Sequence, residues 1–583
     1  MRQVSPESPD IFDFIMELYR ACSGDWNTLV TECNILLEEL EAFFEYAGMF
    51  LCNLGNLYGE GDQKFVPDLT AKDGLEKFID PLLAVPRFSL GYPSKSAHCC
   101  GLLPRPVFPT ELHELAGDIF VVKGNHAEEL AKVCWALEKP NEYAGNNKQT
   151  QLLSHYIECF RTRSLEAFQE AQKAWVTHVA TRVEHLMGFI EPYRDPAGIR
   201  SEWEAMVGIT DPDEAARLKR LVESSTAVIR QPPWAVEDAN DGKGPIEESL
   251  FEALDFTSVH ALAVCGSIVF EAANLPNYEY IRETCGFKNV VLTNRLNANN
   301  NPQLPCYWVA PSQLKFFKDT TRIVRFITTA THELLGHETG KLATETAPGI
   351  YNFNEQNLPT SPISKKAITS HYLPGQTWAS VFGKLVGTVE ECRAILVSEY
   401  LLDDKNLLGI SGYTDDSEIT ASDFLYATYL NIGVDILQAL EDYNFQNQAW
   451  GQVHHQANFS ILKHLQDGDG VIRFAHDPAK SSLTVHIDRS KIISPGKPAL
   501  GRYLSRLHIW RCTADVSSCK DFYEPRCAVE GKYEQWRRIV CSKPSPRWKL
   551  VQPNTFVKGD TVEMKVYEEN NRVIIQSWVE RDV

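Results

Sequence analysis

The sequence has no long apolar run. Nowhere in its 583 residues do about 18 apolar residues follow one another, the length that a membrane-spanning helix requires, so we expect no transmembrane segment. The residues that follow Met1 are polar and acidic and lack the apolar core of a secretory signal. Both absences predict a cytoplasmic protein that does not bind a membrane.

Paired cysteines are also missing. The fifteen cysteines are scattered from Cys22 to Cys541 and include no C-x-x-C pair. An odd total without regular spacing argues against a disulfide framework and suits a reducing compartment. The run His98-Cys99-Cys100 holds three metal-ligating side chains, but adjacent residues chelate one ion poorly and no second half of such a site is visible.

The sequence has fewer basic than acidic residues. The chain has 57 Lys plus Arg against 77 Asp plus Glu, a formal net charge of −20. This balance argues against a nucleic-acid-binding surface and against a basic patch for anionic lipid. Apolar material is plentiful, because 44% of the residues are hydrophobic, and the length predicts two to about four folded domains.

Hydrophobic periodicity predicts a chain that mixes helices and strands. Helices are expected in residues 10–50 with a break at 23–25, and in 126–138, 149–185, 323–337, 378–402, 424–443 and 454–465. Strands are expected at 259–270, 290–292 and 483–488, and a turn at 274–278. No internal repeat is evident.

The stretch His332-Glu333-Leu334-Leu335-Gly336-His337 carries the chemistry. Neutral imidazole is the commonest protein ligand for zinc, and a carboxylate beside the ligands can take a proton from water. This composition indicates a metal-dependent hydrolase. The alternative, two histidines satisfied within a core, stays open on the motif alone.

The spacing of the two histidines differs from the usual zinc helix. They lie five residues apart, and five steps of an α-helix separate side chains by about 140°, too far for both to bind one ion. One wide π-type turn would absorb the extra residue. Gly336, which has no Cβ, is the position where we place that turn.

A hydrolytic zinc site takes three protein ligands and leaves one position for water. Glu390-Glu391, on another predicted helix, is the best source of the third ligand. Two structural alternatives stay open. Thr388 with Glu391 fits a helix capping box, and a glutamate pair on a helix is usually solvated.

At this point the chain resembles a known family. His332 to His337 together with Glu390-Glu391-Cys392-Arg393-Ala394 is similar to the paired signature of the dipeptidyl peptidase III family, the M49 zinc peptidases. Further segments look like family segments in family order: 188–196, 274–278, 286–290, 488–491, 496–500 and 551–555. The likeness is nearly continuous from about residue 150 onward and patchy before it.

The resemblance implies an α+β fold with two lobes and a wide cleft between them. One lobe would be mostly helical and bind zinc, and the other would hold a small β-barrel plus helices. The lower lobe is expected to consist of residues 1–211, 258–303 and 547–583 and to recognise the peptide amino end. Residues 212–257 and 304–546 are expected to form the upper, catalytic lobe.

The resemblance also implies the role of each site residue. His332, His337 and Glu391 would bind one zinc ion, and Glu333 would be the general base. The remaining roles are stabilisation of the oxyanion by Tyr193 and His454, recognition of the free amino end by Glu191, Asn274 and Asn277, and contact with the substrate further along by Arg547.

Residue chemistry alone leaves structural roles open for four of these positions. Tyr193 lies between two prolines and could lock a loop. Asn274 and Asn277 flank a predicted turn, where asparagine is common. His454, next to His455, could be a surface or capping histidine.

The chain departs from the family at three places near the site. Glu338-Thr339 replaces the small residues that members usually have after the second histidine. Ile395 stands where members usually have an acidic residue after the second motif, and Asn458 stands where they usually have arginine. The first hypothesis is therefore a monomeric zinc exopeptidase that removes dipeptides from the amino ends of short peptides. The second is a protein of the same fold that binds peptides or a protein with weak or altered turnover.

Asn458 gives a first testable prediction. We expect Asn458→Arg to lower KM for peptide substrates, because a cation at this position would add a charge-assisted hydrogen bond. Steady-state kinetics over a range of substrate concentrations measures the effect. An unchanged or raised KM would contradict an anchoring role for this position.

Overall fold

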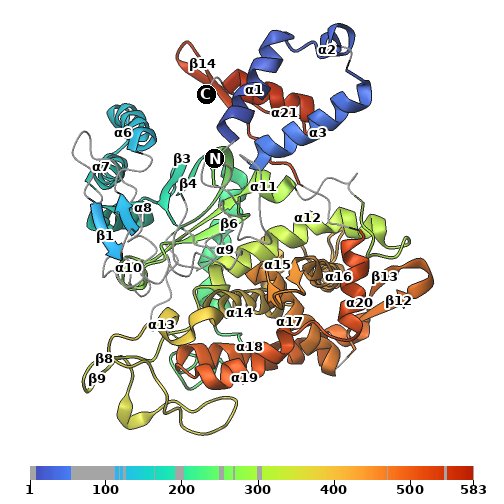
Figure 1. The fold of residues 1–583 in the computed structure, drawn as a ribbon. Coiled ribbons are helices and arrows are strands. Elements are labelled where there is room, and N and C mark those ends of the chain that lie inside the picture. Colours follow the sequence, from blue (N-terminus) through green and yellow to red (C-terminus); the bar gives the residue numbers. More distant parts are fainter. Residues whose placement is uncertain are drawn as a thin grey trace.

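The structure is a computed structural model. It describes residues 8–33, 35–53, 127–162, 164–190, 203–247, 255–266, 269–298, 305–468, 470–543 and 548–581, together with the backbone of two strands, β1 (Leu112–Ala116) and β2 (Ile119–Val122). Figure 1 shows a sheet-containing lobe, a helical lobe and a small group of helices where the two chain ends meet.

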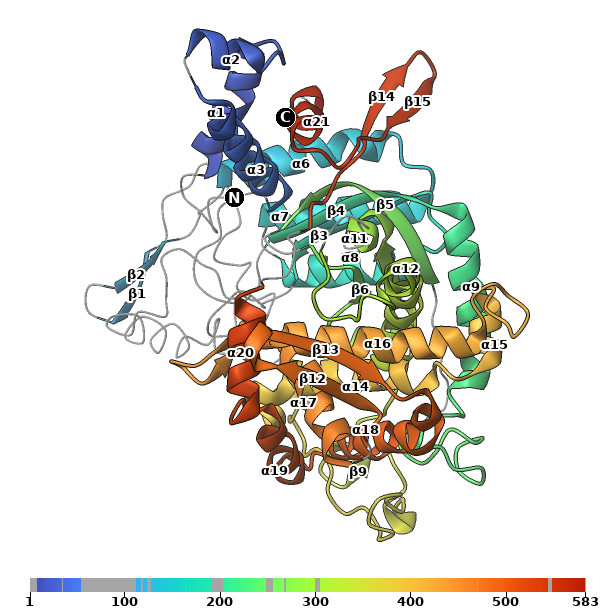
Figure 2. The ribbon, with the colours of Figure 1, turned by 90° about the vertical axis from the view of Figure 1, so that its right-hand side faces the viewer.

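The sheet lobe is built on five strands in the order β3-β4-β5-β7-β6. Their bounds are β3 Val183–Phe189, β4 Trp203–Thr210, β5 Asp255–Cys265, β6 Ala272–Leu275 and β7 Lys288–Leu292. Neighbours are antiparallel except β5 and β7, which are parallel. The sheet curls into a half-barrel, as Figure 2 shows from the side.

Helices cover this sheet. They are α6 Ala127–Glu142, α7 Asn147–Thr162, α8 Leu165–Thr177, α10 Glu279–Cys285 and α11 Thr293–Ala298. All of them except α11 share its core. Tyr156, Trp175 and Val259 are fully buried between helices and strands. Because apolar groups lie on both sides of the curled sheet, its strands do not alternate cleanly between apolar and polar residues.

The helical lobe surrounds α14 (Val386–Leu401). Helices α12, α17 and α18 all pack against α14, which is buried on every side and therefore has no polar face. The main helices around it are α9 Pro212–Val228, α12 Leu314–Thr331, α16 Ala421–Ala439, α17 Val453–Gly468, α18 Lys497–Cys512, α19 Val516–Cys527 and α20 Lys532–Cys541.

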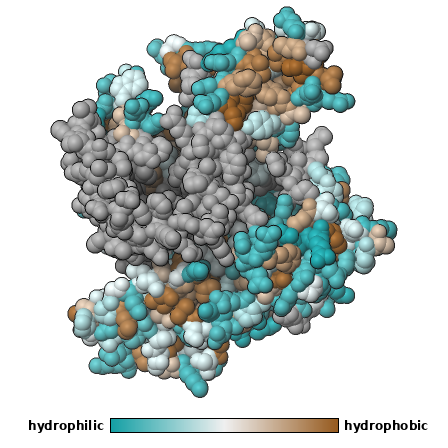
Figure 3. All heavy atoms as spheres, viewed as in Figure 1, coloured by the Kyte–Doolittle hydropathy of each residue, from teal (hydrophilic) through white to brown (hydrophobic). Residues whose placement is uncertain are grey.

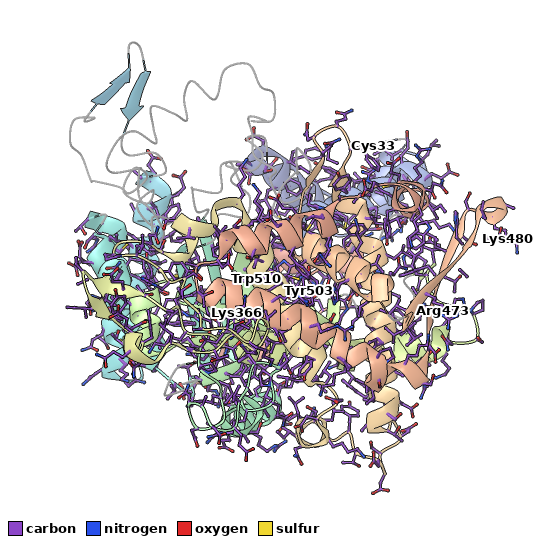
Figure 4. The ribbon with its side chains drawn as sticks, turned by 90° about the horizontal axis from the view of Figure 1, so that it is seen from below. Cys33, Lys366, Arg473, Lys480, Tyr503 and Trp510 are labelled. Carbon is purple, nitrogen blue, oxygen red and sulfur yellow. The ribbon has the colours of Figure 1, made fainter. Side chains whose placement is uncertain are left out.

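Smaller elements complete the helical lobe. They are α13 Trp378–Phe382, α15 Lys405–Ile410, β8 Glu345–Ala347, β9 Ile350–Tyr351, β10 Tyr443–Asn444, β11 Ala449–Trp450, β12 Ile472–Asp477 and β13 Ser482–Ile487. Figure 4 shows the β12–β13 hairpin projecting outward with Lys480 near its end, while Tyr503 lies among the helices.

The two ends of the chain form a third core. Helices α1 (Ser8–Ala21) and α3 (Leu37–Asn53) pack against α21 (Asn571–Arg581) at the carboxyl end, with α2 (Asn27–Glu32) beside them. Figure 3 shows hydrophobic side chains gathered on this group, where Phe14 and Leu37 are exposed. The hairpin of β14 (Asn554–Lys558) and β15 (Thr561–Lys565) precedes α21.

Most predicted elements are confirmed, and two are wrong in part. The predicted helix 149–185 consists of α7, α8 and the first residues of strand β3. Both faces of β3 are covered, so its sequence does not alternate between apolar and polar residues as a half-exposed strand would. The first two residues of the predicted turn at 274–278 are the end of strand β6, because Asn274 and Leu275 pair with β7. The domain boundaries stay a prediction, and His98-Cys99-Cys100 lies outside the described residues.

Two further observations concern membrane-spanning helices and cysteine thiols. Among the helices that the structure describes, none is both long enough and apolar enough to cross a membrane. The cysteines of the described ranges, thirteen in number, all carry free thiols.

The shared core of the chain ends gives a second prediction. Ile575 of α21 is fully buried among side chains of α1 and α3. Ile575→Ala should lower the free energy of unfolding of this helical group by about 2–5 kcal/mol, because it leaves a cavity. Urea unfolding followed by tryptophan fluorescence measures the loss, since Trp26 lies in the same core. Val566→Ala, at a side chain that is 70% exposed, is the control, and equal midpoints for both variants would contradict the shared core.

Candidate active site

The two motif histidines lie at the end of α12, where the helix widens. Residues His332–Gly336 form a π-helical turn, and the backbone N–H of His337 donates to the carbonyl of His332 at 3.2 Å. The wide turn brings the two Nε2 atoms to 3.0 Å from one another. The predicted π turn is therefore confirmed, and it repairs the five-residue spacing.

Gly336 is required at this turn by its neighbour rather than by its own backbone angles. A Cβ on Gly336 would lie 2.7 Å from the Cβ of Ala394 and 2.8 Å from its Cα, closer than real contacts allow. The missing side chain lets the turn approach α14 directly. The expected place of the turn is right, while the reason is close packing against the second motif.

That close approach brings Glu391 of α14 to the histidines. Its Oε2 lies 3.3 Å from Nε2 of His332 and 3.7 Å from Nε2 of His337. Ligand atoms bound tetrahedrally at about 2.0–2.1 Å from zinc lie about 3.3–3.4 Å apart, so the three side chains fit one zinc ion. Two imidazoles and a carboxylate are also a donor set that zinc accepts.

The two structural alternatives for Glu391 do not hold. Thr388 lies inside α14, which begins at Val386, and its hydroxyl is hydrogen-bonded to the hydroxyl of Tyr523 at 2.5 Å, so it caps no helix. Glu391 is 6% exposed and therefore is not a solvated surface glutamate. Its side chain faces the histidine pair instead.

Glu333 and His454 complete the cluster. A carboxylate oxygen of Glu333 lies within 4.8 Å of ligand nitrogens of both motif histidines, and the residue is buried. His454 of α17 places Nε2 3.1 Å from Oε2 of Glu391. Two other groups of ligating atoms among the described residues also lie within 4.8 Å of one another: His332 with Glu333 and His337, and His332 with Glu391 and His454.

The charges of the site follow from its burial. Burial by itself would raise the pKa of the Glu391 carboxyl, but the facing His454 and His337 hold that pKa well below its ordinary value. Burial would likewise raise the pKa of Glu390, and Arg393 and Arg511 outweigh it. Both glutamates are therefore anions at neutral pH, the ionisation state that a cation site requires.

Glu390 has a role that the sequence did not reveal. Its Oε1 lies 3.3 Å from Nδ1 of His337, whereas the other ring nitrogen, Nε2, faces His332. Arg393 donates to the same carboxylate, and Nε of Arg511 lies 2.8 Å from its Oε2. A carboxylate that contacts the second ring nitrogen of a metal-binding histidine orients that ring. The sequence offered one indication of this role, because Glu390 directly precedes the proposed ligand Glu391.

Ile395, where an acidic partner was expected from the resemblance, packs its side chain against the apolar core of the helical lobe. Glu390 contacts Nδ1 of His337, and no described carboxylate is found on Nδ1 of His332. Asn458 lies on α17, one turn beyond His454, and is partly exposed.

The sheet lobe reaches the same turn through Asn274. The Nδ2 of Asn274 donates to the backbone carbonyl of Glu333 at 3.2 Å and to Oδ1 of Asn289 at 2.6 Å. Asn277 follows β6 in the connection to α10 and is partly exposed. The structure thus brings six of the ten predicted residues to the site or its border, and the place of Asn277 in the site stays a prediction. Glu191, Tyr193 and Arg547 lie outside the described residues.

Two imidazoles, a ligand carboxylate and a second carboxylate beside them define a metallopeptidase site, and comparisons with known proteins agree. A profile of peptidase family M49 matches residues 107–582. Dipeptidyl peptidase 3 of Rattus norvegicus is 31% identical over 676 residues, which cover 99% of this chain and 88% of the rat protein. Dipeptidyl peptidase 3 of Homo sapiens is 30% identical, with coverage of 99% and 89%.

Solved structures show the same fold. DPP III from Caldithrix abyssi aligns with a TM-score of 0.58 at 20% identity, over 92% of this chain and 88% of that one. Dipeptidyl-peptidase III from Corallococcus sp. strain EGB aligns with a TM-score of 0.59 at 15% identity, over 94% and 88%. The chain belongs to peptidase family M49 and is a peptidase, which confirms the resemblance drawn from the two motifs.

The contact between Gly336 and Ala394 gives a third prediction. Gly336→Ala should weaken zinc binding about tenfold or more and lower the free energy of unfolding by about 1–3 kcal/mol, because the added methyl pushes the turn from α14. Zinc titration and urea unfolding measure the two effects. Gly409→Ala in α15, where an added Cβ meets nothing within 4 Å, is the matched control. Control-like values for Gly336→Ala would show that the close approach is dispensable.

Proposed function

We propose that the protein is a zinc-dependent exopeptidase that releases dipeptides from the amino terminus of short peptides. The observation that carries the proposal is the triangle of His332 Nε2, His337 Nε2 and Glu391 Oε2, with sides of 3.0, 3.3 and 3.7 Å. A zinc ion held there would supply Lewis acidity to water and to the scissile carbonyl. The names of the relatives support dipeptide release.

Glu333 is the proposed general base. Its carboxylate lies beside the histidine pair, so it can accept a proton from the attacking water while the water oxygen bonds to the carbonyl carbon. The same carboxylic acid then returns the proton to the nitrogen of the leaving peptide as the C–N bond breaks. One residue thereby serves both proton transfers.

His454 is the proposed hydrogen-bond donor to the oxyanion. Gln452 Nε2 lies 2.9 Å from Nδ1 of His454, and an amide nitrogen only donates, so Nδ1 accepts. A ring that accepts at Nδ1 carries a proton on Nε2, the nitrogen that faces Glu391 and the site. Tyr193 would supply a second donor, as the resemblance implies.

Recognition of the free amino end is proposed for Glu191, Asn274 and Asn277, and contact with the following residues for Arg547. A carboxylate and amide oxygens accept hydrogen bonds from an ammonium group. Asn274 supports this placement because its side chain borders the carbonyl of Glu333. Amino-end recognition next to the general base would restrict the cut to a bond near the peptide terminus. A monomer in the cytoplasm stays a prediction.

A fourth prediction tests this function. Purified protein should release dipeptides from dipeptidyl-arylamide substrates, lose the activity in chelator and regain it with zinc. Glu333→Gln should lower kcat at least about 100-fold, because it removes the general base, while zinc content stays unchanged. Glu563→Gln, on the exposed hairpin strand β15, is the control.

The proposal fails if release by the wild type is absent, or if chelation and Glu333→Gln leave it unaffected. Substrate binding without release would favour the second hypothesis, a peptide-binding protein with weak turnover. Acetylation of the substrate amino group separates endopeptidase from exopeptidase action, because an amino-end requirement predicts loss of cleavage.

A further inference from the structure

An ion pair joins the sheet lobe to the metal-binding turn. Arg282 of α10 donates through Nη2 to the carboxylate of Glu338, the residue that follows His337. The side chains are only 17% and 6% exposed. Charged groups this far from water are stable when they are paired and costly when one partner is removed, so the contact constrains both elements strongly.

The same guanidinium reaches the other end of the turn through Asn274. Nη1 of Arg282 donates to Oδ1 of Asn274 at 2.6 Å and to the carbonyl of Pro276 at 3.1 Å. Asn274 in turn donates to the carbonyl of Glu333, which follows His332. The planar fork of arginine can satisfy these divergent acceptors at once. One side chain therefore holds the residues next to both histidine ligands.

Other contacts attach the segment after the turn to its own lobe. The backbone N–H of Gly340 donates to the buried carboxylate of Glu247 at 2.7 Å, and Arg511 donates to the carbonyl of Gly340 at 3.3 Å. The connection to the helical lobe thus does not depend on Arg282. What Arg282 adds is a link between β6 and the turn.

We infer that Arg282 and Glu338 form a clamp, through Asn274, that fixes the metal-binding turn against strand β6. Arg282 is a positioning residue: it sets the spacing of the histidine ligands and the distance between the metal and the strand proposed to hold the peptide amino end. The inference deepens the proposed function and rests on it for the role of β6. The clamp contacts themselves are independent of the reaction.

The fifth prediction tests the clamp with Arg282→Met, Glu338→Gln and the double variant. Each single variant should raise the zinc dissociation constant about tenfold, the effect typical of groups that orient metal ligands. The double variant should bind zinc no more weakly than Arg282→Met alone, because that variant already removes the contact that Glu338 makes. Arg282→Lys keeps the charge but not the fork and should restore part of the affinity. Competition with a chromophoric chelator measures the dissociation constants.

Lys497→Met is the matched control. Lys497 is ion-paired with Asp403 at comparable exposure, 26% and 24%, but the pair lies at the start of α18 in the helical lobe. Its loss should leave zinc affinity unchanged. A role in stability alone would lower the unfolding midpoint of the clamp variants without changing their zinc affinity, and that result would overturn the inference.

Hydrogen exchange of the metal-free protein provides a readout without zinc or substrate. Amides of residues 272–275 and 332–337 should exchange faster in Arg282→Met and Glu338→Gln than in the wild type and Lys497→Met. Unchanged exchange there, or zinc effects that multiply in the double variant, would refute the clamp. A wild type that releases no dipeptide while these shifts are observed would refute the proposed function and leave the clamp standing.

Discussion

The site depends on one close contact, between the π turn at the end of α12 and the middle of α14. Gly336 lies against Ala394 with no room for a side chain between them. Because of this approach, Glu391 faces the two histidine nitrogens at ligand spacing. Densely packed interiors resist small displacements, so the geometry of the site is as rigid as the helix packing that makes it.

The contact between the turn and α14 also buries charged side chains, which costs free energy unless they are paired. Two glutamates and two arginines of the α14 and α18 region lie largely out of water near the histidines, and buried charges of this kind need partners. Arg393 and Arg511 neutralise Glu390, while the imidazoles face Glu391. With its charge balanced by the two arginines, Glu390 can orient the ring of His337. Glu391 faces the position where zinc would bind. A cation there would complete the balance.

The two lobes meet at the turn, and each contributes something different. The helical lobe supplies the proposed ligands, the proposed base Glu333 and His454, all from helices that share one core. The sheet lobe contributes an edge strand and α10, which contact the turn through Asn274 and Arg282. The proposed function places binding of the peptide end on the sheet lobe and hydrolysis on the helical lobe, and these contacts join the two.

The sequence by itself determined the elements that local chemistry controls. The motif histidines with Glu333, the π turn between them and the helix that carries Glu391 follow from residue types and spacing. The M49 family follows from the resemblance of the two motifs to a known signature. The turn is local because an extra residue in a helix must be absorbed within a few positions. Only the tertiary structure decided which distant groups meet. Glu390 on His337, Arg282 on Glu338 and Asn274 on the carbonyl of Glu333 join residues from separate elements. Such pairings depend on how helices and strands pack, and this packing cannot be predicted from the spacing of residues along the chain.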